Sequence, residues 1–396
     1  MIGPAESIGA MARPKRTFGM NGCANCLLLK QCGGHPLPMI RELGCVNYAN
    51  REAAIDTDDM NPLFPERFWE LWDDVGGLTD YRIGPLRTIS PVGLPFYVAN
   101  FQNRHLRRSR LLDAPVVALR LFDVVRRRKD GIYGAKYATA SELRRAYKLR
   151  QDTAILLVGV DLDAPIESFW EAHRLPGVLE SIRDLGVIGV TVPNFSYFTC
   201  VPRFQIMRNW KRILLSAERL SVAGIPVAPH LNANTAGDWE AAYEFLRDHP
   251  EVSVVTMEFQ TGTRANGEVG EEVFRELVRL QDRLGRALHP LLVGAARFYL
   301  EARKHFATFT VIDSQPFMQA VSRQVLIVDA QGRHVWKERP TPEGAPLDEL
   351  IETNMLLYPD KLNSGWQDPA TPAPAVDSRQ AEFSLTTSMP YLTAQP

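Results

Sequence analysis

Short apolar runs alternate with amphipathic segments along most of the chain after Pro95. Eight of these runs are apolar throughout rather than at every second position, which is typical of parallel strands covered on both faces. They lie at 93–101, 115–125, 154–163, 187–196, 225–234, 252–261, 289–296 and 309–317. The pattern therefore predicts a series of strand–helix units.

The segments between the runs have helical periodicity. Apolar side chains recur every three or four residues between 202 and 223, and again between 271 and 288, with charged residues on the opposite side. Eight strand–helix units in about 225 residues predict a (β/α)8 TIM-like barrel. An open doubly wound sheet is the alternative, and the lack of G-x-G-x-x-G after the first strand argues against its dinucleotide-binding form.

The barrel is expected to occupy residues 93–325, with further segments on both sides. Residues 1–92 form an N-terminal module with a helical piece at PERFWELWDDVGG, and residues 326–357 contain a hairpin that turns at AQGR. Residues 358–396 are rich in Pro, Ala and Ser and are expected to form a flexible tail.

Four of the five cysteines lie near the N-terminus, with the spacing C-x2-C-x5-C-x12-C. They are Cys23, Cys26, Cys32 and Cys45. The clustering predicts a metal centre, because thiolates bind soft metals and short spacers let one loop supply several ligands. A disulfide framework is the least favoured interpretation, since the beginning of the chain lacks the apolar core of a signal peptide and we expect a reducing, cytoplasmic compartment.

The irregular spacing favours a [4Fe–4S] cluster over zinc, because zinc sites usually pair two C-x2-C halves. The segment C-x2-C-x5-C resembles the cluster motif of iron–sulfur DNA glycosylases, and CGG resembles auxiliary-cluster loops of radical enzymes. Four ligands would leave no iron open to substrate. The centre is therefore expected to serve structure, redox sensing or electron transfer rather than catalysis.

Polar residues occur at the carboxyl ends of the expected strands, where barrel enzymes hold their active sites. The candidate catalytic residues are Asp161, His230, Glu258 and Asp313. Carboxylates there suit a nucleophile or general base, and His230 suits a general acid. The candidate substrate-binding residues are Asn194, Ser196, Tyr197, Arg203, Arg208, Asn232 and Arg297. The fifth cysteine, Cys200, is interpreted as a small buried apolar side chain.

The net charge of −1 conceals a basic segment. Between Arg104 and Arg150 there are 14 Lys and Arg against 4 Asp and Glu, a net charge of +10 that leaves −11 elsewhere. The candidate nucleic-acid-binding residues are Arg107, Arg108, Arg110, Arg126, Arg127 and Arg128. Such clustering indicates a phosphate-bearing partner. Salt bridges to the acidic remainder of the chain are the alternative.

One segment carries a family resemblance. From Val190 to Pro229, the pattern P-x-F-S-x-Y, then P, Q-I-x-x-N, a basic patch and G-I-P-V resembles a family of uncharacterised barrel proteins common in phages and mobile elements. This chain departs from the family at Asn194 and at Thr199–Cys200, where acidic residues are usual. A barrel joined to a four-ligand metal module is also similar in architecture to tRNA-guanine transglycosylase-like enzymes, which use a mouth aspartate as nucleophile.

Three functions remain open from the sequence. The first is a metal-cluster-containing enzyme that acts on nucleic acid or nucleotide by base modification or glycosidic-bond chemistry. The second is a non-catalytic subunit, stabilised by the four-cysteine centre, that binds nucleic acid or protein. The third is an iron–sulfur redox enzyme acting on a small molecule. No apolar run approaches the roughly 20 residues of a membrane span, so no membrane partner is expected.

Overall fold

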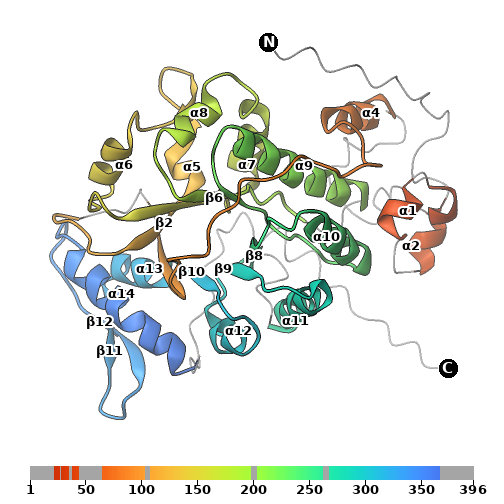
Figure 1. Ribbon diagram of the computed structural model, residues 1–396. Helices are drawn as coiled ribbons and strands as arrows, with labels where there is room; N and C mark the ends of the chain where they lie inside the picture. Colours follow the sequence, from red (N-terminus) through yellow and green to blue (C-terminus); the bar gives the residue numbers. More distant parts are fainter. Residues whose placement is uncertain are drawn as a thin grey trace.

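The structure is a computed structural model that describes residues 22–26, 28–34, 38–43, 65–102, 108–197, 203–261 and 267–365 (Figure 1). None of the helices in these ranges is long and apolar enough to cross a membrane.

Eight parallel strands form a nearly closed barrel, which confirms the predicted architecture. They are β1 (Tyr97–Phe101), β2 (Val116–Arg120), β5 (Ala154–Val158), β6 (Gly189–Thr191), β7 (Val227–Ala228), β8 (Val254–Glu258), β9 (His289–Val293) and β10 (Thr310–Asp313). Their order around the barrel follows the chain, and β1 pairs with β10. A bridge between His230 and Thr256 joins β7 to β8. All carboxyl ends of the strands therefore meet at one mouth.

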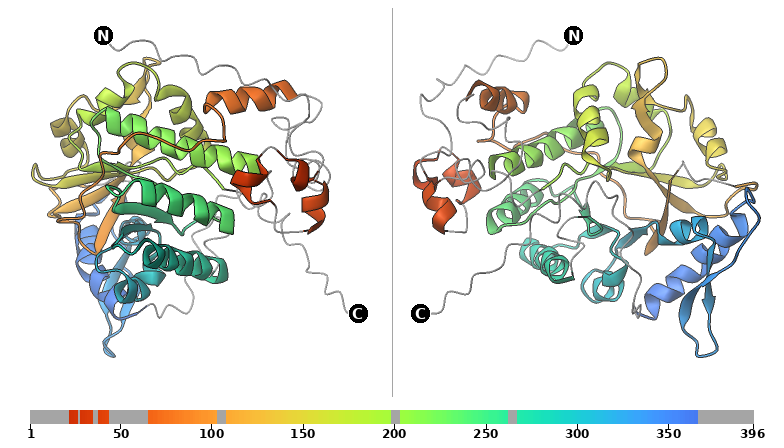
Figure 2. Two further views of the ribbon diagram at one scale, coloured as in Figure 1. Left: turned by 45° about the vertical axis from the view of Figure 1, so that its right-hand side comes forward. Right: turned by 180° about the vertical axis from the view of Figure 1, so that it is seen from behind.

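Helices cover the outside of the barrel (Figures 1 and 2). They are α5 (Leu121–Val124), α6 (Ala140–Ala146), α7 (Asp163–Ala172), α8 (Val178–Arg183), α9 (Arg203–Val222), α10 (Ala236–Asp248), α11 (Gly267–Leu284) and α12 (Tyr299–His305), which follows the 3-10 helix η5 (Ala296–Phe298). Apolar side chains of α11, such as Phe274 and Leu277, are buried, and the Phe274 ring stacks on that of Phe298 in η5. The helices expected at 202–223 and 271–288 are present as α9 and α11.

Two early units depart from simple strand–helix alternation. Among the described residues between β1 and β2 there is no helix. The run predicted as one strand at 115–125 ends as a strand at Arg120, and α5 buries Leu121, Phe122 and Val124. A small antiparallel hairpin, β3 (Val125–Arg127) and β4 (Tyr133–Ala135), follows within the same connection. Arginines of the basic segment thus form an extra hairpin rather than a barrel helix.

The C-terminal extension packs against the last strand of the barrel. It comprises α13 (Gln315–Val321), the antiparallel pair β11 (Gln324–Val328) and β12 (His334–Glu338), and α14 (Asp348–Asn363). The hairpin agrees with the one predicted from the sequence. Helix α14 continues beyond the expected start of the tail, and Tyr358 is fully buried. Residues 366–396 lie outside the described residues.

The N-terminal elements lie beside the barrel helices. They are the 3-10 helix η1 (Cys23–Asn25), α1 (Leu29–Cys32), α2 (Pro38–Leu43) and α4 (Pro65–Asp74). Helix α1 contacts α9 and α10. The approach is close: a Cβ atom at Gly237 in α10 would lie 2.9 Å from the carbonyl oxygen of Cys32. Because the amino ends of helices that follow barrel strands lie on the mouth side, the cysteine module stands at the rim of the mouth.

Candidate active site at the barrel mouth

Side chains that face the barrel lumen form layers of four, each contributed by alternate strands. Following the strand pairings around the barrel gives an upper layer of Asn100, Val158, His230 and Val293. The next layer toward the mouth contains Arg120, Pro193, Glu258 and Ser314. In the first layer Asn100 stands across the lumen from His230, and in the second Arg120 stands across from Glu258. We call the first layer the floor of the mouth.

The floor contains polar groups despite its burial. Asn100 is 7% exposed, and its Oδ1 atom has no hydrogen-bond partner among the described residues. Gln102, which follows β1 and lies above the floor toward the mouth, has a buried Oε1 atom that also lacks a hydrogen-bond partner among the described residues. His230 is fully buried at the bridge to β8, where Leu231 N donates to Thr256 O at 2.9 Å. The apolar Val158 and Val293 complete the layer.

Asp161 is held by an arginine that the sequence analysis did not select. Arg120, at the end of β2, forms an ion pair with the Asp161 carboxylate, and the amide of Leu162 donates to Asp161 Oδ1 at 2.8 Å. The Arg120 side chain is 21% exposed, whereas that of Asp161 is 4% exposed. Arg120 directly follows a continuous apolar run. A single arginine at the end of a buried strand is the feature of the sequence that indicates this residue. Because the Asp161 carboxylate is buried in this ion pair, the group that faces the lumen is the Arg120 guanidinium.

Glu258 is almost completely buried at the end of β8. The amide of Gln260 donates to its Oε1 at 2.5 Å, and Thr261 Oγ1 donates to its Oε2 at 2.9 Å. These contacts come from its own loop and fix the carboxylate at the rim of the lumen.

Asp313 does not join the other candidate catalytic residues. Its neighbour Ile312 packs inside the lumen, so the alternation of side chains along a strand turns Asp313 outward. There Tyr358 Oη donates to Asp313 Oδ2 at 2.8 Å, and Gln315 N donates to Oδ1 at 2.8 Å. Burial raises the pKa of this carboxyl group. Asp313 therefore fastens α14 to the barrel.

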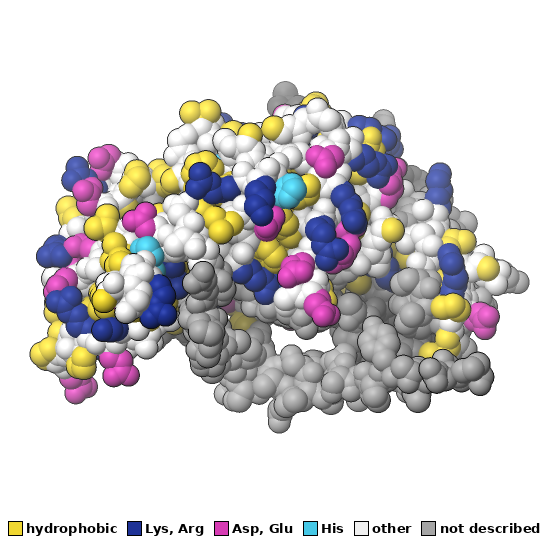
Figure 3. All heavy atoms as spheres, turned by 90° about the horizontal axis from the view of Figure 1, so that it is seen from below, with side chains coloured by type: hydrophobic (Ala, Val, Ile, Leu, Met, Phe, Trp, Pro, Cys, Tyr) yellow, Lys and Arg dark blue, Asp and Glu magenta, His cyan; other side chains and the backbone are white. Residues whose placement is uncertain are grey.

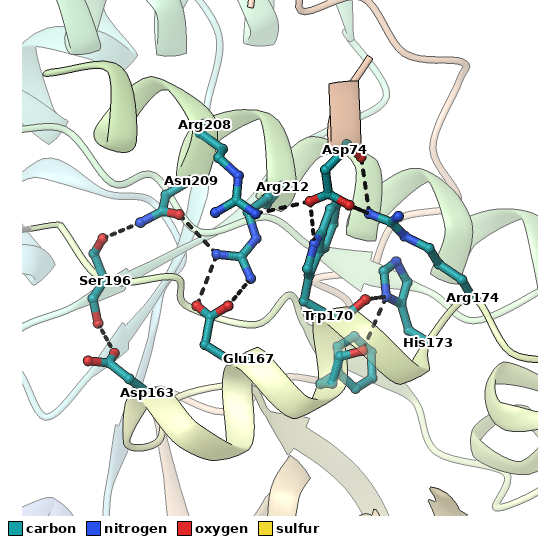
Figure 4. Close-up of polar contacts among 11 residues, drawn as sticks. Asp74, Asp163, Glu167, Trp170, His173, Arg174, Ser196, Arg208, Asn209 and Arg212 are labelled. Atoms are coloured by element: carbon teal, nitrogen blue, oxygen red, sulfur yellow. Dashed lines mark hydrogen bonds and ion pairs between the residues drawn. The ribbon is translucent and has the colours of Figure 1, made fainter. Parts of the chain in front are cut away.

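The two candidate asparagines lie together at the ends of β6 and β7. Asn232 Nδ2 donates to Asn194 Oδ1 and also to Phe195 O, the latter at 3.0 Å. Ser196 Oγ donates to Asp163 at the start of α7, and Asn209 Nδ2 donates to Ser196 O at 2.6 Å (Figure 4). Tyr197 is half-buried and immediately precedes residues 198–202, which lie outside the described residues and include Cys200.

Two candidate arginines of the same region, Arg203 and Arg208, form ion pairs with acidic residues of neighbouring helices. Arg203 pairs with Asp238 at 2.6 Å, and both side chains are less than a tenth exposed. Arg208 pairs with Asp74 of α4 at 3.0 Å (Figure 4). The guanidinium of Arg297 lies 4.7 Å from the centre of the Phe298 ring. The sequence indicates which loops and helices carry these arginines, but it does not show which groups their guanidinium ions contact.

A polar network around Trp170 fastens α4 to α7 and α9 (Figure 4). Trp170 Nε1 donates to Asp74 Oδ2 at 2.8 Å, and Arg174 pairs with Asp74 at 2.8 Å. Burial alone would raise the pKa of Asp74, but these hydrogen bonds and charges lower it. Arg212 pairs with Glu167 and lies 4.9 Å from the centre of the Trp170 ring. The network is structural, because it lies among the outer helices.

Three of the four candidate metal ligands are described. Cys23 is buried, and Cys26 and Cys32 are half-buried; Cys45 lies outside the described residues. Within the described ranges, no group of three or more His, Cys, Asp or Glu side chains is arranged to hold a metal ion. Burial opposes the charge of Arg203, but Asp238 and then Cys32 raise its pKa above the ordinary value. A contact between Cys32 and Arg203 therefore links the cysteine module to α9.

The basic segment is divided between two places in the fold. Arg108 is buried, and its Nε atom lies 3.4 Å from Asp348 Oδ1. Arg110 forms an ion pair with Glu352 of α14. On the β3–β4 hairpin, Arg126 is exposed, Arg127 donates to Gly131 O at 2.9 Å, and Arg128 pairs with Asp130 at 2.9 Å. Arg107 lies outside the described residues. On the face shown in Figure 3, Lys and Arg side chains are interspersed with Asp and Glu.

No protein-family model matches the chain, and no curated protein sequence is significantly similar to it. The resemblance of residues 190–229 to the phage barrel family stays a prediction, and the site is interpreted from its own geometry.

Proposed function

We propose that this chain is a barrel enzyme that acts on a nucleotide, or on a nucleotide unit of nucleic acid, by base modification or glycosidic-bond chemistry at the barrel mouth. The observation that carries the proposal is the pair of opposed groups above the floor. Arg120 and Glu258 stand on opposite sides of the lumen, over Asn100 and His230. A guanidinium suits a phosphate, and a buried carboxylate suits acid–base or nucleophilic work.

The division of the basic segment favours a nucleotide-sized substrate over a long duplex. Arg108 and Arg110 are paired with acidic residues of α14, and Arg128 is paired within its own hairpin. Affinity for long nucleic acid depends on many simultaneous phosphate contacts. A single arginine at the mouth is sufficient to orient one phosphate group.

The roles in a hydrolysis follow from this arrangement. Glu258 accepts a proton from water while the water oxygen forms a bond to C1′ of the ribose. The bond from C1′ to the base nitrogen breaks, and His230 donates a proton to the departing base. Asp161 holds Arg120 in position through their ion pair. The proton gained by Glu258 leaves through solvent, and His230 regains one before the next cycle.

Glu258→Gln tests the proposal, because the amide retains the shape of the side chain but cannot act as a base. We expect release of free base from nucleoside monophosphates, measured by chromatography, to fall about 10²- to 10⁴-fold. Glu240→Gln is the matched control, since Glu240 lies in an exposed pair with Arg283 on the outer helices. Glycosidic-bond chemistry is ruled out if the parent protein releases no base, and the role of Glu258 is ruled out if Glu258→Gln releases it at the parent rate; the proposal as a whole fails if chromatography also shows no modified base in the parent reaction.

We also propose that Cys23, Cys26, Cys32 and Cys45 bind a metal centre, with [4Fe–4S] favoured and zinc as the alternative. Support comes from the spacing of the four residues and from the position of the three described cysteines in short consecutive helical turns. Its role would be structural, at the rim of the mouth. Iron, zinc and inorganic sulfide analysis of anaerobically purified protein tests this, and metal-free folded protein would contradict it.

A further inference from the structure

We propose that the floor of the mouth binds the exocyclic amino group of a nucleobase. The inference rests on the proposed function, because it assumes that the ligand is a nucleotide. Its starting point is Asn100, which is 93% buried, faces the lumen and has an Oδ1 atom without a partner among the described residues. A buried acceptor without a donor destabilises the protein, so a ligand that supplies an N–H group gains affinity there.

A second acceptor makes the requirement more specific. Gln102 Oε1 is also buried without a partner among the described residues. Gln102 directly follows β1, and residues two apart on an extended strand share one face, so the side chain of Gln102 is expected on the same lumen side as that of Asn100. A primary amino group has two N–H donors and can satisfy both acceptors at once. A carbonyl group in its place would leave both unsatisfied and would repel them.

The surroundings favour a neutral, ring-bound amino group over an ammonium ion. The pairing of Phe101 with Leu119 places Arg120 beside Gln102 on the next strand, and a guanidinium disfavours a second cation. Val158 and Val293 occupy the remaining two sides of the floor and offer apolar contact to the faces of a planar ring. Arg120 lies one layer closer to the mouth than Asn100, where the phosphate of the same nucleotide would be expected.

Matched pairs of nucleotides test the inference directly. AMP differs from IMP, and CMP from UMP, mainly by an amino group in place of a carbonyl group. We expect isothermal titration calorimetry on the full chain to give at least tenfold tighter binding of AMP than IMP, and of CMP than UMP. Asn100→Leu should abolish this preference, whereas Asn100→Asp, which keeps an acceptor, should retain it. Gln331→Leu, on the exposed turn of the β11–β12 hairpin, is the control and should change nothing.

The outcomes separate the inference from the function on which it rests. If none of the four nucleotides binds, the proposed function and this inference both fail. If all four bind with equal affinity, or if IMP and UMP bind more tightly, the inference fails and the proposed function stands. Preference for AMP that survives in folded Asn100→Leu protein also contradicts the inference, because another group would then recognise the amino group.

Discussion

Arg120 and Arg203 show how the surroundings of an arginine decide its role. Both pair with a nearly buried aspartate, but Arg120 ends a barrel strand at the lumen, whereas Arg203 begins α9 beside the cysteine module. The Arg203 and Asp238 side chains are 7% and 8% exposed. Arg203→Met should therefore leave a buried carboxylate without its cation, and should lower the free energy of unfolding in guanidinium chloride by about 3–5 kcal/mol.

The matched control for that change is Arg283→Met. Arg283 pairs with Glu240 across α10 and α11, but both side chains are about half exposed, so water replaces the lost contact. We expect a cost under about 1 kcal/mol. Equal losses for the two variants would mean that the Arg203–Asp238 pair contributes no more than a surface ion pair.

At the scale of elements, the contact of α1 with α10 depends on a glycine. Gly237 lies in the first turn of α10, where Gly→Ala ordinarily stabilises a helix by about 1 kcal/mol. Here the added Cβ would lie 2.9 Å from Cys32 O, so we expect Gly237→Ala to displace α1. Trypsin cleavage after Lys30, an exposed residue of α1, should become several times faster. Gly267→Ala in α11, where a Cβ meets no atom within 4 Å, should leave the rate unchanged, and equal rates in both variants would refute the prediction.

The strands could be predicted from the sequence because each one is apolar on both faces. The same property hides which face points inward, since a continuous apolar run has no alternation to read. This is why Asp313 was grouped with Glu258, although the two side chains face opposite sides of the strands.

Helix α14 was not predicted because Pro359 lies inside it, and proline usually ends a helix. The role of Arg120 could not be predicted from the sequence because its ion pair with Asp161 joins residues 41 positions apart.

At the scale of the whole molecule, two buried histidines are expected to set the dependence of stability on mild acid. Burial and then Arg219 lower the pKa of His173 from 6.5 to about 4, and burial lowers the pKa of His289 to about 4. His173 caps the carboxyl end of α7 and His289 lies in β9, so the two act independently. Each is neutral when folded, and its Nε2 atom contacts Arg219 or Thr310.

The direction of the effect follows from linkage. A histidine whose folded pKa lies below its unfolded value binds more protons when unfolded, so stability is full above pH 6.5 and is lost as the pH falls toward 4. Between pH 7 and pH 5 we expect each histidine to cost about 2 kcal/mol, measured as the free energy of unfolding in urea. Carboxylates with lowered pKa values, such as Asp80 at about 2, lose their contribution only at lower pH, so they add little between pH 7 and pH 5. The His173→Gln/His289→Gln double variant should show a much flatter dependence, whatever its stability at pH 7. An unchanged slope in that variant would assign the acid sensitivity to other groups.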